Sequence, residues 1–148
     1  MPLRPGFDVD RFNRFGKDFL PGFVGLLITE VSDGMLKGEL ELRKALLAPN
    51  GYLHAGTVVT LADSCCVMGC MASFPEGVAG FTTVELKTNF LRTATAGGLG
   101  CRATLAHAGR TTQVWDAAVE REEDGKPLAL FRCTQYLLAD PRGRQERT

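Results

Sequence analysis

The sequence has no net charge of either sign, because its 17 lysine and arginine residues balance 17 aspartate and glutamate residues. A chain without an overall field does not attract nucleic acid or an anionic membrane surface, so any anion must be bound locally. No apolar run approaches the ~20 residues that a membrane-spanning helix needs. The first ten residues carry two acids and two prolines, unlike a secretory or transit peptide. We therefore expect a cytoplasmic protein that binds neither nucleic acid nor membranes.

Metal-ligating residues are scarce as well. The two histidines, His54 and His107, lie far apart in the sequence, and the five cysteines form no pair of CxxC clusters. Zinc sites usually need such pairs, so the sequence predicts no metal site and no redox cofactor. The cysteine count is odd and three cysteines fall within residues 65–70, which favours reduced thiols. Cys65, Cys66 and Cys70 are most simply residues that pack in the core.

Length and hydrophobic pattern predict one α+β domain over residues 1–148, with a peripheral start (1–20) and end (139–148). Residues 56–73 are apolar in every direction of a helical wheel, which predicts a buried helix. The turn sequences TAGG, HAGR and EDGK suit consecutive antiparallel pairing of the last four strands. We therefore expect a curved antiparallel sheet of about six strands wrapped around one long central helix. The expected strands are 24–28, 35–44, 80–92, 99–107, 111–121 and 127–138.

Asp63 is the only charged residue in the segment NGYLHAGTVVTLADSCCVMGC, residues 50–70. Burying an ionised carboxylate is costly unless partners compensate, so Asp63 is either satisfied by local hydrogen bonds or kept for chemistry. Desolvation also raises the pKa of a carboxyl group toward the range of a general base. Asp63 is the best catalytic candidate in the chain.

The start of the predicted helix is the second candidate feature. Its first turn offers unpaired N–H groups at the positive end of the helix dipole, which can hold an oxyanion. His54 either points into this site or simply caps the helix. An N–H near residue 55 and a carboxylate at residue 63 lie ~12 Å apart on one helix, too far to touch one carbonyl. If both are catalytic, two antiparallel copies of the helix must share their sites in a homodimer.

The segment NGYLHAGTVVTLAD resembles the N…G…HGG…LAD segment of hot-dog fold acyl-CoA thioesterases, of the phenylacetic-acid-degradation and 4-hydroxybenzoyl-CoA thioesterase type. Residues 81–97 and 107–116 are similar to the strand and the hairpin that follow the helix in this family. The resemblance implies hydrolysis of an acyl-CoA thioester on a homodimer or on a tetramer of two dimers. Coenzyme A then enters only as part of the substrate.

The resemblance assigns the family's acidic nucleophile or general base to Asp63, the polarising N–H to Ala55 and the preceding histidine to His54. Thr83 matches a strand position that carries a hydroxyl near the attacking water or carboxylate. The implied substrate-binding residues are Gly56 at the helix start and, for the coenzyme's phosphates, Arg92, Arg110 and Thr111.

Two positions depart from the family pattern. Ala55 replaces the usual glycine, so the N–H is kept and a methyl group is added beside the carbonyl. Ala48 stands where the family commonly has Asn or Gln, six residues before the histidine. Asn50 takes over that role only if the loop runs differently.

Two other functions stay open at this stage. One is a non-catalytic module that binds or senses acyl-CoA, although the chain has no basic helix or extra domain for DNA. The other is an enoyl-CoA hydratase of the same fold, which pairs an Asp and a His at one helix start. The nine-residue gap from His54 to Asp63 argues against such a pair within one chain.

Overall fold

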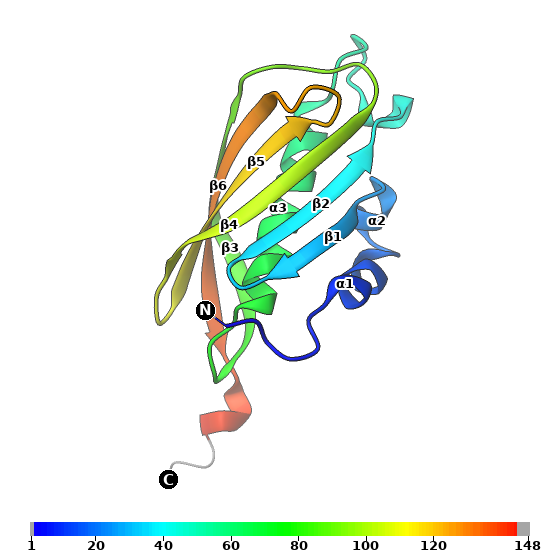
Figure 1. The fold of residues 1–148 in the computed structure, drawn as a ribbon. Coiled ribbons are helices and arrows are strands. Elements are labelled where there is room, and N and C mark those ends of the chain that lie inside the picture. The colour runs from blue at the N-terminus through cyan, green and yellow to red at the C-terminus, as the bar shows by residue number, and fades with distance from the viewer. Residues whose placement is uncertain (1, 145–148) are drawn as a thin grey trace.

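The computed structural model describes residues 2–144. A six-stranded antiparallel sheet curves around a long helix (Figure 1), which confirms the predicted architecture. The strands are β1 (Leu27–Ser32), β2 (Met35–Glu41), β3 (Val78–Phe90), β4 (Gly98–Ala108), β5 (Thr112–Arg121) and β6 (Pro127–Ala139). The helices are α1 (Val9–Gly16), α2 (Leu20–Phe23) and α3 (Ala55–Ala72), with 3-10 turns at Lys44–Leu46 and Pro141–Arg144.

The strands lie in the order β1-β2-β4-β5-β6-β3. The hairpins β4–β5 and β5–β6 confirm the predicted turns HAGR and EDGK, and β1 and β2 also pair as an antiparallel hairpin. The prediction that TAGG joins neighbouring strands is wrong, because β3 pairs with β6 at the far edge and residues 91–97 cross the end of the sheet. Gly97, at φ 92°, supplies a left-handed backbone to this crossing as readily as it would to a hairpin.

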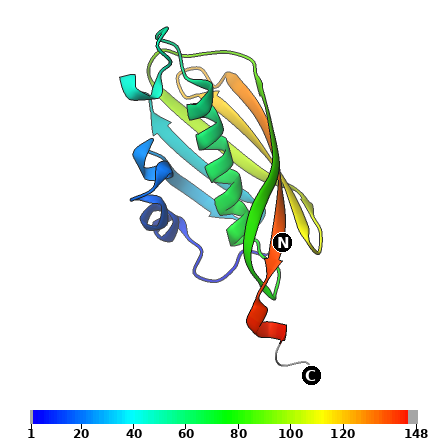
Figure 2. The same cartoon turned by 180° about the vertical axis from the view of Figure 1, so that it is seen from behind.

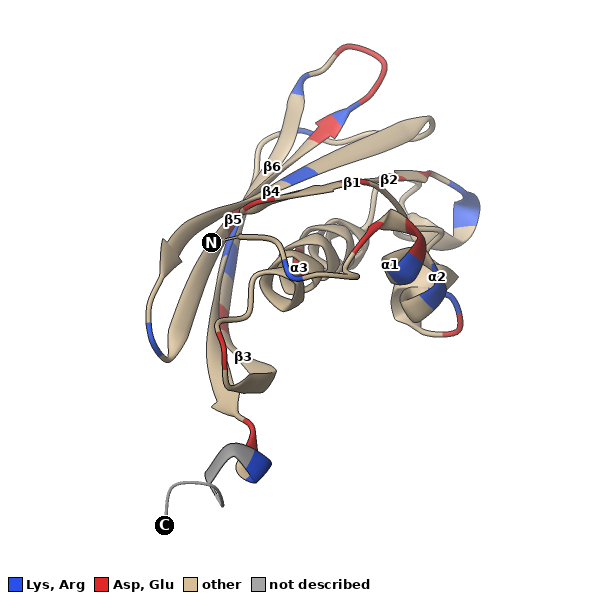
Figure 3. Ribbon diagram, turned by 60° about the horizontal axis from the view of Figure 1, so that its bottom comes forward, with Lys and Arg blue, Asp and Glu red and all other residues tan. Residues whose placement is uncertain are grey.

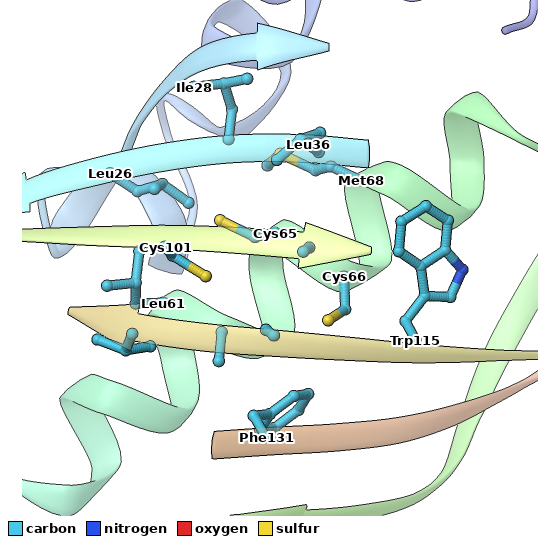
Figure 4. Close-up of a cluster of buried hydrophobic side chains, with 14 of the residues drawn as sticks. Leu26, Ile28, Leu36, Leu61, Cys65, Cys66, Met68, Cys101, Trp115 and Phe131 are labelled. Carbon is cyan, nitrogen blue, oxygen red and sulfur yellow. The ribbon is translucent and has the colours of Figure 1, made fainter. Parts of the chain in front are cut away.

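The core lies between α3 and the concave face of the sheet. Trp115 of β5 is fully buried, and its Nε1–H donates to Gln113 Oε1 at 2.8 Å. Gly69 allows the Trp115 ring to pack closely against α3, because a Cβ at residue 69 would lie only 2.6 Å from that ring. All five cysteines are free thiols, as predicted, and Cys101 and Cys133 are buried as well as the three predicted core cysteines. Burial raises the pKa of the Cys70 thiol to about 12. The same buried cluster includes Leu36, Leu61, Cys65, Cys66, Cys101 and Phe131 (Figure 4).

The opposite face of α3 is less covered than the sequence predicts. Seen from behind, α3 lies in front of the sheet between β3 and the α1–α2 segment (Figure 2), and the end-on view shows the same arrangement (Figure 3). By length and composition α3 could cross a membrane, but 56% of it is buried here as a core helix. The half-buried residues on its open face are Val59, Thr60, Asp63, Ser64, Val67 and Met71.

The N-terminal segment 1–20, expected to be peripheral, supplies two core side chains. Phe7 and Phe12 are buried, and their rings lie 5.8 Å apart. The Asn13 side chain ties α1 to β1 by two hydrogen bonds with the backbone of Ile28, at 2.8 and 3.0 Å. At the other end, residues 145–148 of the expected peripheral tail lie outside the described residues.

The first strand begins at Leu27 instead of residue 24, because the chain forms α2 immediately before it. Pro21 lies in the first turn of α2, where its missing N–H costs nothing. The Pro21 carbonyl then accepts from Leu26 N at 3.0 Å and ends the turn. This short helix places apolar side chains beside the start of α3.

Phe12→Ala should lower the free energy of unfolding by about 3–5 kcal/mol, because a ring that is only 1% exposed leaves a cavity. The matched change Phe15→Ala, on the same helix at 53% exposure, should alter it by less than about 0.5 kcal/mol. Urea unfolding at one protein concentration measures both. Equal effects would show that α1 is not part of the folded core.

Candidate active site

The start of α3 leaves one backbone donor free. His54 is the N-cap, and its Nδ1 accepts from Gly56 N at 2.8 Å. The His54 carbonyl accepts from Thr57 N and Val58 N at 3.0 and 3.4 Å. Within residues 2–144, the exposed Ala55 N–H has no acceptor. The positive end of the α3 dipole therefore presents this single N–H to solvent.

The loop before α3 uses Asn50 for its own turn. Asn50 Oδ1 accepts from Tyr52 N at 3.2 Å, and Ala48 exchanges backbone hydrogen bonds with Tyr52 and Gly51. Gly51, at φ 87°, provides the left-handed backbone that the turn requires. The exposed Asn50 side chain thus stabilises the loop, and among the described residues it makes no hydrogen bond with the helix start.

Asp63 lies half-buried in the middle of α3. Its Oδ1 is buried, and no group among the described residues hydrogen bonds to it. Burial raises the pKa of this carboxyl above its usual value, as predicted from the sequence. Local hydrogen bonds therefore do not satisfy this oxygen. A desolvated carboxylate without a partner is a stronger base and is free to meet a ligand.

Thr83 contacts a residue that the sequence analysis missed. Its hydroxyl donates to Oε1 of Gln135 on β6 at 2.8 Å, and Gln135 Nε2 donates to Cys133 Sγ at 3.3 Å. Gln135 is fully buried on the concave side of the sheet. A glutamine at an inward position of the strand alternation, between Cys133 and Leu137, is the signal that could have revealed it.

The three predicted phosphate contacts lie at opposite ends of the sheet (Figure 1). Arg92 Nη1 donates to Pro127 O at 2.8 Å, at the end where Leu53 N bonds Ala94 O beside the start of α3. Arg110 and Thr111 form the β4–β5 turn at the other end. One copy of the chain therefore does not bring them together.

The same separation applies to the two catalytic candidates. Ala55 and Asp63 lie two turns apart on α3, which is ~12 Å along its axis. Among residues 2–144, no three His, Cys, Asp or Glu side chains converge in a way that could hold a metal ion. One copy thus offers an oxyanion donor at one place and a desolvated carboxylate at another.

Comparison with known proteins identifies the family. The family model described as thioesterase superfamily matches residues 50–128, more than half of the chain. The chain belongs to the thioesterase superfamily. This thioesterase is 32% identical over 111 residues to the 1,4-dihydroxy-2-naphthoyl-CoA hydrolase of Listeria monocytogenes, covering 75% of this chain and 89% of that protein.

Solved structures confirm the hot-dog fold of the thioesterase. A crystal structure of a mutant of thioesterase PA1618 from Pseudomonas aeruginosa matches with a TM-score of 0.88 and 27% identity, covering 95% of this chain and 100% of that one. The PaaI protein from the phenylacetic acid degradation operon of E. coli matches with a TM-score of 0.77 and 23% identity, covering 87% and 91%. The predicted family and enzyme class, a thioester hydrolase, are confirmed.

The raised pKa of Asp63 predicts an unusual pH dependence of stability. Because the folded state binds this proton more tightly than the unfolded state, the contribution of Asp63 becomes less favourable as the pH rises from 3.8 through the folded pKa. At pH 7, Asp63→Asn should therefore have a higher free energy of unfolding than the wild type. Chemical denaturation across pH 3.8–7 should show this difference shrinking toward the acid end.

Asp116 provides a control of opposite sign. Its hydrogen bond with Arg132 lowers the pKa of its carboxyl, so its favourable contribution exists above pH 3.8 and is lost as the pH falls through the folded pKa. Asp116→Asn should therefore be less stable than the wild type at pH 7. If the two variants moved in the same direction, burial would not govern the titration of Asp63.

Proposed function

We propose that the protein hydrolyses acyl-CoA thioesters to a free acid and coenzyme A in the cytoplasm, at sites shared between two copies of the chain. The observation that carries the proposal is that one helix of a thioesterase-superfamily protein holds two polar groups without hydrogen-bond partners among the described residues. These are the N–H of Ala55 and the desolvated carboxylate of Asp63, neither of which has a hydrogen-bond partner within residues 2–144.

The Ala55 N–H stabilises the negative charge that develops on the thioester oxygen. Asp63 acts in one of two ways. As a nucleophile it attacks the carbonyl carbon, the C–S bond breaks, coenzyme A leaves as a thiolate that takes a proton from solvent, and water hydrolyses the resulting anhydride. As a general base it removes a proton from the water that attacks the carbonyl. His54 holds the helix start by accepting from Gly56 N.

The edge strand β3 supports a dimer. Within residues 2–144, β3 pairs only with β6, so its other edge presents unpaired backbone groups. Val84 (60% exposed), Leu86 and Phe90 leave apolar surface on the same strand. A long, apolar free edge favours pairing with another strand. Antiparallel pairing of two β3 strands across a two-fold axis would continue the sheet and cover this surface.

The same two-fold relation resolves the separations within one copy. It turns the two copies of α3 in opposite directions, so that Ala55 of one copy can face the partner's Asp63. It also sets opposite ends of the two sheets side by side, which lets Arg92 and the partner's Arg110 serve one coenzyme. Since the Listeria monocytogenes relative is named for an aromatic acyl-CoA, aromatic acyl-CoAs are the first substrates to test.

Release of coenzyme A from benzoyl-CoA, followed as loss of thioester absorbance, tests the chemistry. Asp63→Asn should reduce kcat at least a hundredfold. Ala55→Pro should reduce it about 10²–10³-fold by removing the oxyanion donor. Proline fits this position, because it is the first of α3 and His54 already has φ −71° and ψ 133°. Ala55→Gly, which keeps the N–H, is the matched control. Binding of acyl-CoA without turnover of any of a panel of thioesters would contradict hydrolysis.

Mixing the two inactive variants tests whether sites are shared. In a mixed dimer, Ala55 of the Asp63→Asn copy meets the intact Asp63 of the Ala55→Pro copy, so one of the two sites is complete. Random reassortment should restore about a quarter of wild-type activity. Val84→Lys in both copies should block the β3 edge and abolish the recovery, whereas Leu27→Lys on the opposite edge strand should not. No recovery from co-refolded dimers would place each site within one copy.

A further inference from the structure

Thr88 of β3 holds a buried oxygen that the proposed mechanism does not use. Within residues 2–144, three buried side-chain oxygens lack a hydrogen-bond partner, namely Asp63 Oδ1, Ser73 Oγ and Thr88 Oγ1. Ser73 follows the end of α3 and lies ~15 Å from Asp63 along the helix axis. Buried polar atoms are normally paired with protein groups or ordered water, so each of these oxygens requires an explanation.

The Thr88 side chain points to the inner face of the sheet, toward α3. Thr88 pairs with Phe131 across the β3–β6 ladder, and the side chains of directly paired residues lie on the same face of a sheet. Phe131 is 3% exposed and belongs to the core on the inner face (Figure 4). Because side chains alternate along a strand, the neighbouring Lys87 points to the outer face, beside its partner Arg132.

The contact between Gly69 and Trp115 fixes the level of α3 against the strands. The Trp115 ring packs on Gly69. Trp115 is paired with Cys133 of β6, and Cys133 is paired in turn with Leu86 of β3. Gly69 of the helix and Leu86 of β3 therefore lie at about the same level.

From this level, the direction toward the start of α3 leads to Asp63 and to Thr88. Asp63 lies ~9 Å before Gly69 along the helix axis. Thr88 lies ~7 Å beyond Leu86 along the strand. β3 runs in this direction, because the chain that follows it bonds the loop before α3. Asp63 and Thr88 thus come to about the same level on neighbouring elements.

Asp63 also lies on the side of α3 that faces β3. Asp63, Cys66 and Cys70 are spaced i, i+3 and i+7, so they share one side of the helix. The hydrogen bond with Cys66 lowers the pKa of the Cys133 thiol on β6, and the charge of Asp63 acts in the opposite direction. β3 is the strand next to β6, and α3 lies beside it (Figure 2). Asp63 Oδ1 and Thr88 Oγ1 therefore face one gap between α3 and β3.

The two oxygens of the Asp63 carboxylate have different surroundings. Oδ1 is buried, although the residue as a whole is half-buried on the open face of α3. Oδ2 is therefore the oxygen that can reach a substrate. One water molecule between Thr88 Oγ1 and Asp63 Oδ1 gives both buried oxygens a partner, because a hydroxyl donates and a carboxylate accepts. The nearby thiols of Cys66 and Cys133 are only weak donors.

We propose that Thr88 is a positioning residue for Asp63, whose Oδ1 it holds through one water molecule so that Oδ2 faces the thioester. The inference rests on the proposed function and adds a residue to its site. A carboxylate that is held at one oxygen keeps one orientation at the other, and this orientation serves attack on the carbonyl and removal of a proton from water alike.

Two substitutions separate the hydroxyl of Thr88 from its methyl group. Thr88→Val keeps the shape but removes the hydroxyl, so kcat for the best thioester of the panel should fall at least about tenfold, with KM within about twofold. Thr88→Ser keeps the hydroxyl and should stay within about threefold of the wild type. A purely structural role would reverse this order, because Thr88→Ser leaves a cavity and Thr88→Val does not.

Thr82→Val is the matched control. It makes the same change at an exposed position of β3 whose pairing partner is Tyr136, and both kinetic constants should stay within about twofold. Thr88→Ala and Thr88→Ser differ only in the hydroxyl, so this pair repeats the comparison if Thr88→Val folds poorly.

Titration of Asp63, followed by NMR of its carboxyl carbon, gives a readout that needs no turnover. Because the bridged hydroxyl favours the charged carboxylate, Thr88→Val should raise the pKa of Asp63 above its wild-type value, and Thr88→Ser should not. The other titratable groups that face this gap, Cys66 and Cys133, are the same in all variants.

The two readouts separate failure of the inference from failure of the proposed function. If the wild type hydrolyses no thioester but Thr88→Val still raises the pKa of Asp63, the hydrolase function fails and the link between Thr88 and Asp63 stands. If the pKa of Asp63 is the same in Thr88→Val and the wild type, or if Thr88→Ser is as impaired as Thr88→Val, the inference is overturned.

Discussion

The structure depends on covering α3, a helix of 18 residues whose single charge is Asp63. Such a helix is not stable in water by itself, since its apolar surface must be removed from solvent. The sheet curves because it has to cover this surface from one side. The Gly69–Trp115 contact sets how closely the two layers approach. The curved sheet over one side of α3 follows from this requirement.

The same requirement makes Asp63 informative. A carboxylate in a buried helix loses hydration, and no donor among the described residues compensates its Oδ1. At the helix start, most backbone donors do have partners. His54 accepts hydrogen bonds from the N–H groups of the first turn except that of Ala55. In the proposed function, a substrate and a second copy of the chain supply the partners of these two groups.

Local pattern was sufficient for the elements that depend on neighbours in sequence. The apolar wheel of residues 56–73 and the hairpins at HAGR and EDGK were predictable, because period and turn chemistry determine them. The pairing of β3 with β6 was not, since the order of strands in a sheet depends on how the whole chain closes around α3. Nor could the sequence decide whether His54 caps the helix or points into the oxyanion site. The 2.8 Å distance between His54 Nδ1 and Gly56 N identifies it as a cap.

The connection from β3 to β4, which crosses the end of the sheet, also constrains how the protein folds. β3 precedes β4, β5 and β6 in the sequence, but in the part of the chain that the structure describes it pairs only with β6, the last of these strands. During synthesis, β3 therefore has no partner strand until β6 has been synthesised. Until then its apolar side chains Val84, Leu86 and Phe90 are exposed to solvent. Pairings over such long sequence separations are slow, and apolar edges that wait for them are prone to aggregate. The edge that we propose to join two finished copies is thus also the one that is exposed to aggregation while the chain is incomplete.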